Sequence, residues 1–159
     1  MPEPPRVALH RSAEIPASAD EVWELISDWA GMRRWWLTAE EGGLQGPGLV
    51  SCELVGEHRA VPRMRRMTLG NGAVAEETII YQNDKTRRIS YTKADEPNIT
   101  GYVATTYVDD LDSDSCTVHL VSMFDVDDPA YRVAAAARFE AVYAAMFNGY
   151  RRYFTREAV

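Results

Sequence analysis

Two arginines and two glutamates lie close together in the sequence, and residues of these types can move a proton. Arg65 and Arg66 precede a Gly-Asn-Gly sequence at positions 70–72, and Glu76 and Glu77 follow it. A carboxylate can remove a proton from a substrate, and a guanidinium can stabilise the oxyanion that forms. The same residue types also form exposed ion pairs between neighbouring strands, which stabilise a protein only slightly. The elements that carry these side chains decide between the two roles.

The Gly-Asn-Gly sequence predicts a hairpin whose register has two possibilities. With a two-residue turn, Arg65 opposes Thr78, and Glu77 lies on the opposite face of the hairpin. With a three-residue loop and Gly72 in the left-handed bulge position, Arg65 opposes Glu77 directly. Side chains alternate between the faces of a strand, so only one of Glu76 and Glu77 can face the interior. The pattern permits both registers.

This hairpin belongs to a longer succession of β segments separated by turn signals. The predicted strands are Leu49–Leu54, Arg63–Leu69, Val74–Tyr81, Arg87–Lys93, Tyr102–Val108 and Thr117–Phe124, with an acidic turn from Asp109 to Ser115. Consecutive strands joined by short turns run antiparallel, so we expect an antiparallel meander.

Before the meander, the sequence predicts one strand and then two helices. The segment from Val7 to about Glu14 alternates weakly, as a strand does. Ser18 and Glu21 have the spacing of a capping box. An apolar stripe follows at helical spacing and consists of Val22, Trp23, Ile26 and Trp29. A short second helix is expected around Met32–Trp36.

The last stretch of the chain predicts one long helix, from Pro129 to about Phe154. Proline suits the first turn, and Gly149 is the one glycine in this stretch. An apolar and aromatic stripe recurs at helical spacing and consists of Phe139, Val142, Tyr143, Met146, Tyr150 and Tyr153. The tyrosine hydroxyls need partners or water, so the stripe could belong to a core or line a cavity. Only this helix is long enough to cover the sheet, and the predicted fold class is α+β.

Composition limits the classes of function. The 159 residues suit one domain, residues 1–159, and a formal net charge of −7 argues against nucleic acid or an anionic membrane as partner. No apolar run is long enough to span a membrane. The N-terminal residues lack the features of a signal peptide, and Cys52 and Cys116 are isolated. We therefore expect a cytoplasmic protein that is a monomer or a homodimer.

No sequence feature predicts a cofactor or a metal ion. The glycine-rich stretch at 42–48 matches neither nucleotide-binding fingerprint, and the three histidines are separated from the cysteines and from one another. The acids at 110–114 have the spacing of a calcium loop. However, Ser115 replaces the required glycine and Val121 the bidentate glutamate, so a solvated hairpin turn explains the acids better.

Several of these residues occur in an order that resembles a known family. They are Val22-Trp23, Trp35-Trp36, the motif Arg65-x-Met-x-Leu-x-x-Gly-x-x-x-x-Glu77 and Arg87-Arg88-Ile-Ser-Tyr91. From about Val7 to Phe154 the chain is similar to the polyketide cyclase/dehydrase group of the START-like (SRPBCC) superfamily. The resemblance implies the helix-grip fold, in which a curved antiparallel sheet wraps around a long C-terminal helix and leaves a hydrophobic cavity.

The resemblance also implies the place of a site. The superfamily includes an enzyme with an arginine and a glutamate in its cavity, and on our matching these fall on Arg65 and Glu77. The expected substrate-binding residues are Trp36, Tyr91, Leu120, Tyr143, Met146 and Tyr150. Leu120 stands where many members have a tryptophan facing the cavity, which implies a larger pocket. The Gly42–Gly48 segment is a candidate mobile lid, because glycine gives the backbone freedom.

Two classes of function are consistent with such a cavity. In the first, the protein is a cofactor-independent enzyme of secondary metabolism that cyclises, dehydrates or isomerises a small hydrophobic, polyketide-like or aromatic molecule. Glu77 would then remove a proton, and Arg65 would stabilise the oxyanion. In the second, the protein is a carrier or sensor that binds such a molecule without chemistry. A ligand that returns chemically changed would distinguish the two.

Overall fold

The computed structural model describes residues 6–37 and 48–157 of the chain. The described residues form seven strands, two α-helices and two short 3-10 helices. In chain order these are β1 (Arg6–Ile15), α1 (Ala19–Ser27), η1 (Met32–Arg34), β2 (Leu49–Val55), β3 (Arg63–Leu69), β4 (Val74–Asn83), β5 (Arg88–Lys93), β6 (Ile99–Asp112), β7 (Ser115–Val126), η2 (Pro129–Tyr131) and α2 (Arg132–Glu157). The order of strands and helices is the one that the sequence predicts.

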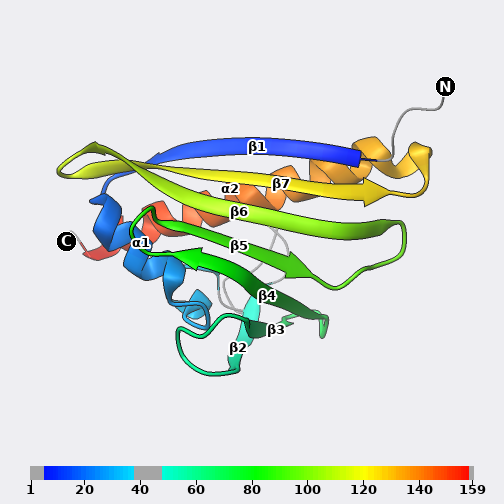
Figure 1. Ribbon diagram of the computed structural model, residues 1–159, viewed down its shortest axis with the longest axis horizontal. Helices are drawn as coiled ribbons and strands as arrows, with labels where there is room; N and C mark the ends of the chain where they lie inside the picture. Colours follow the sequence, from blue (N-terminus) through cyan, green and yellow to red (C-terminus); the bar gives the residue numbers. More distant parts are fainter. Residues whose placement is uncertain (1–5, 38–47, 158–159) are drawn as a thin grey trace.

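The strands form one antiparallel sheet in the order β1-β7-β6-β5-β4-β3-β2. Helix α2 runs along one face of this curved sheet, beside β1 and β7, and its C-terminal end lies near α1 (Figure 1). Buried hydrophobic side chains from the sheet and both helices form one cluster between the layers. This arrangement is the helix-grip fold, which confirms the predicted α+β class.

Helix α1 begins at the predicted capping box. The Ser18 hydroxyl accepts a hydrogen bond from the Glu21 amide at 3.2 Å, and the Glu21 carboxylate accepts one from the Ser18 amide at 3.4 Å. The two contacts satisfy amides that the first turn of a helix otherwise leaves free. They fix the start of α1. The helix ends at Ser27, two residues before Trp29.

The β3–β4 hairpin has the three-residue loop. The Leu69 amide donates to the Ala73 carbonyl at 2.9 Å and closes the loop, and Gly72 has a φ of 85°. A residue with a Cβ would be strained at this φ, which explains the glycine. Arg65 consequently opposes Glu77. Of the two registers that the pattern permits, the chain adopts the one that places these two residues on the same face.

Strands β6 and β7 are longer than predicted. β6 begins at Ile99 and ends at Asp112, and β7 begins at Ser115, so much of the stretch predicted as an acidic turn is strand. The register shifts between Thr100 and Val103, and Gly101 has a φ of 65° at this irregularity. Glycine therefore absorbs a bulge within β6, which begins three residues before the predicted start at Tyr102.

The final helix starts slightly later than predicted. Pro129–Tyr131 form the 3-10 turn η2, and the Asp128 carboxylate caps this turn by accepting from the Ala130 amide at 3.0 Å. Helix α2 then continues to Glu157, beyond the predicted end at Phe154. The stripe residues Phe139, Tyr143, Met146 and Tyr150 are buried, whereas Val142 is 39% exposed. The amphipathic pattern thus identified most of the buried face of α2.

Gly149 allows α2 to approach the chain around η1. A Cβ at this position would lie 2.5 Å from the Trp35 carbonyl oxygen and 3.0 Å from the ring atom Cε3 of Trp35. Arg152 donates to the same carbonyl at 2.7 Å, and the Trp35 ring lies 4.7 Å from that of Tyr150. This close packing holds the segment that carries Trp36.

We expect Gly149→Ala to lower the free energy of unfolding by about 1–3 kcal/mol, because the added methyl group meets a backbone oxygen. This change in the free energy of unfolding has the opposite sign to the usual one, since alanine normally stabilises a helix interior by about 1 kcal/mol relative to glycine. Urea denaturation measures the difference. Asn148→Ala, at the neighbouring exposed position of α2, is the control and should have little effect. A Gly149→Ala protein as stable as the parent would contradict this packing.

Candidate functional site

A cavity of about 190 Å³ lies between α2 and the part of the sheet formed by β3, β4, β5 and β6. Most of its described lining is apolar or aromatic, and four charged side chains also contribute. The lining residues are Met32, Trp36, Arg65, Met67, Leu69, Ala75, Glu77, Tyr91, Lys93, Tyr102, Arg138, Phe139, Val142, Tyr143 and Met146. Helix α2 packs mainly against β1 and β7, whereas the sheet residues that line the cavity belong to β3, β4, β5 and β6.

Most of the predicted site residues line this cavity, namely Arg65, Glu77, Trp36, Tyr91, Tyr143 and Met146. Leu120 and Tyr150 do not. Leu120 is fully buried on β7, where α2 packs close to the sheet, and Tyr150 packs against Trp35 in the closely packed region around Gly149. Neither residue borders the described part of the cavity, and their predicted role in substrate binding stays a prediction.

Arg65 and Glu77 form a buried ion pair at the cavity wall. Arg65 Nε and Nη2 both contact Glu77 Oε1, at 2.9 and 2.7 Å. The side chain of Arg65 is 3% exposed and that of Glu77 is 18% exposed. Burial opposes the charged form of Arg65, but the Glu77 carboxylate outweighs this effect and raises the pKa of Arg65. Both contacts use Oε1, and among the described residues the other oxygen, Oε2, has no partner, so it is available to a molecule in the cavity.

Trp29, which follows α1 in the chain, supports this ion pair. Its ring lies under the Arg65 guanidinium, with Cζ 3.7 Å from the ring centroid. Its indole Nε1 donates to the Glu77 carbonyl at 3.1 Å, and its own carbonyl accepts from Arg65 Nη1 at 3.4 Å. The sequence indicated Trp29 only as part of an apolar helical stripe, and its contact with Arg65 spans residues far apart in the chain.

Glu76 lies on the other face of the hairpin. Its carboxylate is 3.5 Å from Arg66 Nη2, and both side chains are 41% exposed. The sequence left open which of the two glutamates faces the interior. In the structure Glu77 lines the cavity, and Glu76 forms an ion pair on the outer face of the hairpin.

Three buried hydroxyl groups are hydrogen-bonded in a row beside the cavity. The Tyr102 and Tyr143 hydroxyls are 2.7 Å apart, and the Tyr143 hydroxyl donates to Ser122 Oγ at 2.6 Å. Burial raises the pKa of both phenols, so they stay protonated at neutral pH. Tyr143 thus offers a ligand mainly its ring, because its hydroxyl is engaged within the protein.

A charged cluster that the sequence did not reveal lies where the cavity meets solvent, and we call Lys93, Glu96 and Arg138 the charged mouth. Lys93 Nζ is 2.5 Å from Glu96 Oε2. Arg138 Nη2 is 3.2 Å from the same oxygen, and its Nη1 contacts Glu96 Oε1. Hydrogen bonds from Arg138 and Lys93 lower the pKa of Glu96 to about 2. The register Glu77↔Lys93 places this cluster one strand from the buried ion pair.

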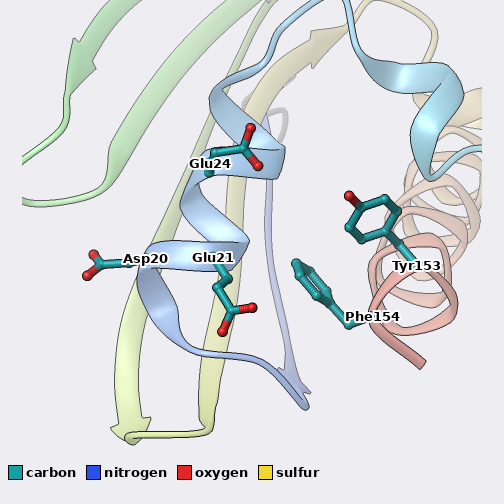
Figure 2. Close-up of a pocket in the computed structure, with 5 residues that line it drawn as sticks. All are labelled: Asp20, Glu21, Glu24, Tyr153 and Phe154. Atoms are coloured by element: carbon teal, nitrogen blue, oxygen red, sulfur yellow. The ribbon is translucent and has the colours of Figure 1, made fainter. Parts of the chain in front are cut away.

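A second hollow, of about 340 Å³, lies between α1 and the C-terminal end of α2 (Figure 2). Asp20, Glu21 and Glu24 extend from α1, and Tyr153 and Phe154 lie opposite on α2 (Figure 2). Its carboxylates already have partners within the protein, because Asp20 binds Arg87, Glu21 accepts from the Ser18 amide and hydroxyl, and Glu24 binds Arg34. It is also an open surface hollow, so we take the smaller apolar cavity as the candidate site.

The candidate lid at Gly42–Gly48 lies outside the described residues except for Gly48. Within residues 6–37 and 48–157, no three His, Cys, Asp or Glu side chains are grouped closely enough to hold a metal ion. In the same part of the chain, no helix has the length and apolar character needed to cross a membrane.

Comparison with known proteins places the chain in a family. The model of the family described as "Polyketide cyclase / dehydrase and lipid transport" matches residues 6–155. The chain belongs to the polyketide cyclase/dehydrase family. This finding confirms the resemblance that the scattered sequence motifs indicated. No curated protein sequence matches the chain.

Solved structures share the fold at low sequence identity. A protein from Thermobifida fusca is 27% identical with a TM-score of 0.70, and the match covers 92% of each chain. Norcoclaurine synthase from Thalictrum flavum, as a point mutant bound to a transition-state analogue, is 18% identical with a TM-score of 0.76 over 100% of both chains. The di-domain ARO/CYC protein BexL, from the BE-7585A biosynthetic pathway, is 16% identical with a TM-score of 0.77. This last match covers 94% of this chain and 46% of BexL.

Proposed function

We propose that this member of the polyketide cyclase/dehydrase family binds a small hydrophobic molecule and removes a proton from a carbon next to a carbonyl group. The observation that carries the proposal is the buried Arg65–Glu77 pair, whose free carboxylate oxygen lies at the wall of an apolar cavity. Loss of such a proton begins aldol-type cyclisations, β-eliminations of water and isomerisations through an enol, none of which requires a cofactor. The family description, which names cyclases and dehydrases, supports chemistry of this class.

The size of the cavity limits the ligand. Drug-sized ligands occupy pockets of roughly 300–1,000 Å³, whereas an apolar cavity of about 150 Å³ holds a molecule such as benzene. At about 190 Å³, the cavity suits one aromatic ring with a short side chain. Trp36, Tyr91 and Phe139 can pack against such a ring.

In the proposed step, Glu77 Oε2 takes the proton as the C–H bond breaks, and the electron pair moves to the carbonyl oxygen. The negative charge thereby passes from Glu77 to the substrate, beside the positively charged Arg65. Arg65 carries five N–H groups, of which Nε, Nη1 and Nη2 each use one in the contacts described above, so N–H groups remain for the new oxyanion. The apolar walls strengthen this attraction because they exclude water.

Deuterium exchange into a simple ketone tests the proposal, because proton removal can be measured on a molecule other than the natural substrate. Phenylacetone, a ketone with one ring, carries methylene protons that exchange slowly in neutral D₂O. We expect the protein to accelerate this exchange, with a rate that saturates as the ketone concentration rises, and proton NMR measures it. Single-ring ketones should also raise the melting temperature by mass action. A rise in melting temperature without any faster exchange would reject catalysis and favour a carrier or sensor.

A further inference from the structure

The charged mouth carries more positive than negative charge. Arg65, Lys93 and Arg138 line the cavity together with one carboxylate, Glu77. Glu96 adds a second carboxylate at the solvent side, so three positive charges face two negative ones. Arg65 is neutralised by Glu77, and Lys93 and Arg138 share Glu96. Among the described residues, one positive charge is thus in excess at the cavity of a protein whose formal net charge is −7.

Lys93 and Arg138 reach the mouth from different layers of the fold. Lys93 ends β5 in the sheet, whereas Arg138 comes from α2. Their side chains are 16% and 43% exposed, and both lie beside the ring of Phe139, with Lys93 Nζ at 5.3 Å and Arg138 Cζ at 5.0 Å from its centroid. A ring in the cavity would thus have two cations at its outer edge, both within the lining.

We propose that the ligand of this cavity is a small aromatic carboxylic acid whose carboxylate binds Lys93 and Arg138. This inference rests on the proposed function, because it assigns a chemical class to the ligand of the same site. The carboxylate of the ligand takes a position beside Glu96 or displaces it from the two cations. Two cations can pair with two carboxylates, so the ligand removes the excess positive charge.

The position of the mouth also orients the ligand. Glu77 and Lys93 are cross-strand partners, and residues in such pairs lie about 4.5–5.5 Å apart at Cα. Both side chains line the same cavity from neighbouring strands, so a ligand whose carboxylate lies at Lys93 extends toward Glu77. The arrangement fits an acid in which the acidic C–H group lies only a few bonds from the carboxylate, as in an aryl-substituted keto acid.

A matched pair of probes tests this assignment. We would measure the binding of 3-phenylpropanoate and its neutral amide, 3-phenylpropanamide, by calorimetry at low salt. The two molecules have nearly the same shape and differ in charge. We expect the acid to bind at least about 10-fold more tightly than the amide, and to lose this advantage as salt screens the charges. Equal affinity of the two probes would overturn the inference and leave the cavity proposal intact, whereas failure of both probes to bind would overturn both.

Variants of the mouth make the test specific. Lys93→Met keeps an apolar side chain of similar length and removes the charge, so it should abolish most of the preference for the acid. Glu96→Gln frees the two cations and should tighten binding of the acid by roughly 3–10-fold without affecting the amide. Arg66→Met is the control, because it removes one positive charge from the outer face and should leave the preference unchanged. If Lys93→Met and Arg66→Met showed the same preference for the acid over the amide, the carboxylate of the ligand would not bind at the charged mouth.

Discussion

Glu77→Gln should slow the exchange of phenylacetone methylene protons by roughly 10²–10⁴-fold relative to the parent protein. The amide of glutamine keeps the shape of the carboxylate and can still accept a hydrogen bond from Arg65. It has no oxygen that takes up a proton at neutral pH, so the step in which the C–H bond breaks loses its base. The cavity walls are unchanged, and we therefore expect the ketone to raise the melting temperature of variant and parent similarly.

The neighbouring glutamate supplies the control for this experiment. Glu76→Gln makes the same chemical change one residue away, on the outer face of the hairpin, where the carboxylate pairs with Arg66. We expect this variant to catalyse exchange of the phenylacetone methylene protons at the parent rate. Exchange by Glu77→Gln at the parent rate would contradict the role of Glu77 as base, and loss of exchange in Glu76→Gln alone would move that role to Glu76.

Arg65→Met should have the largest effect on stability among the changes considered, a loss of about 3 kcal/mol in the free energy of unfolding. Removing one partner of a buried ion pair leaves the other charge without compensation, which typically costs about 3–5 kcal/mol. The lower end of this range applies because the Glu77 side chain keeps 18% exposure to solvent. Methionine fills much of the volume of the arginine stem above Trp29, so the loss reflects charge more than packing.

The double variant Arg65→Met/Glu77→Gln separates the charge effect from packing. Without a carboxylate at position 77, the loss of Arg65 no longer leaves a buried charge, and part of the stability should return. Urea unfolding of the parent, the two single variants and the double variant measures the coupling between the two residues. A double variant whose loss equals the sum of the single losses would show that the two side chains act independently, which would contradict the buried ion pair.

The sheet and the helix contribute different parts to the proposed chemistry. Strands β3 and β4 hold the base and its arginine in fixed register, which is a rigid support for a catalytic pair. Helix α2 contributes the aromatic wall and, through Arg138, one side of the charged mouth. A change in how α2 lies on the sheet would therefore alter the shape of the cavity without moving the base.

The sequence by itself determined the local elements. The capping box at Ser18, the apolar stripe of the final helix and the strand segments depend on residues within a few positions of one another, so pattern predicts them. The loop at Gly70-Asn71-Gly72 is also local, and it limited the hairpin to two registers. The family resemblance implied that Arg65 and Glu77 share the cavity, which agrees with the register that the structure has.

Only the tertiary structure decided which side chains surround that pair. Trp29 meets Arg65 across 36 positions and Arg138 meets Glu96 across 42, and such contacts depend on the curvature of the sheet and the depth at which α2 lies on it. These properties result from many packing contacts at once, among them the close approach at Gly149. Apolar periodicity marks a residue as interior but does not distinguish a filled core from a cavity wall. For this reason the sequence predicted both Tyr143 and Tyr150 as cavity residues. In the structure Tyr143, and not Tyr150, belongs to the described lining of the cavity.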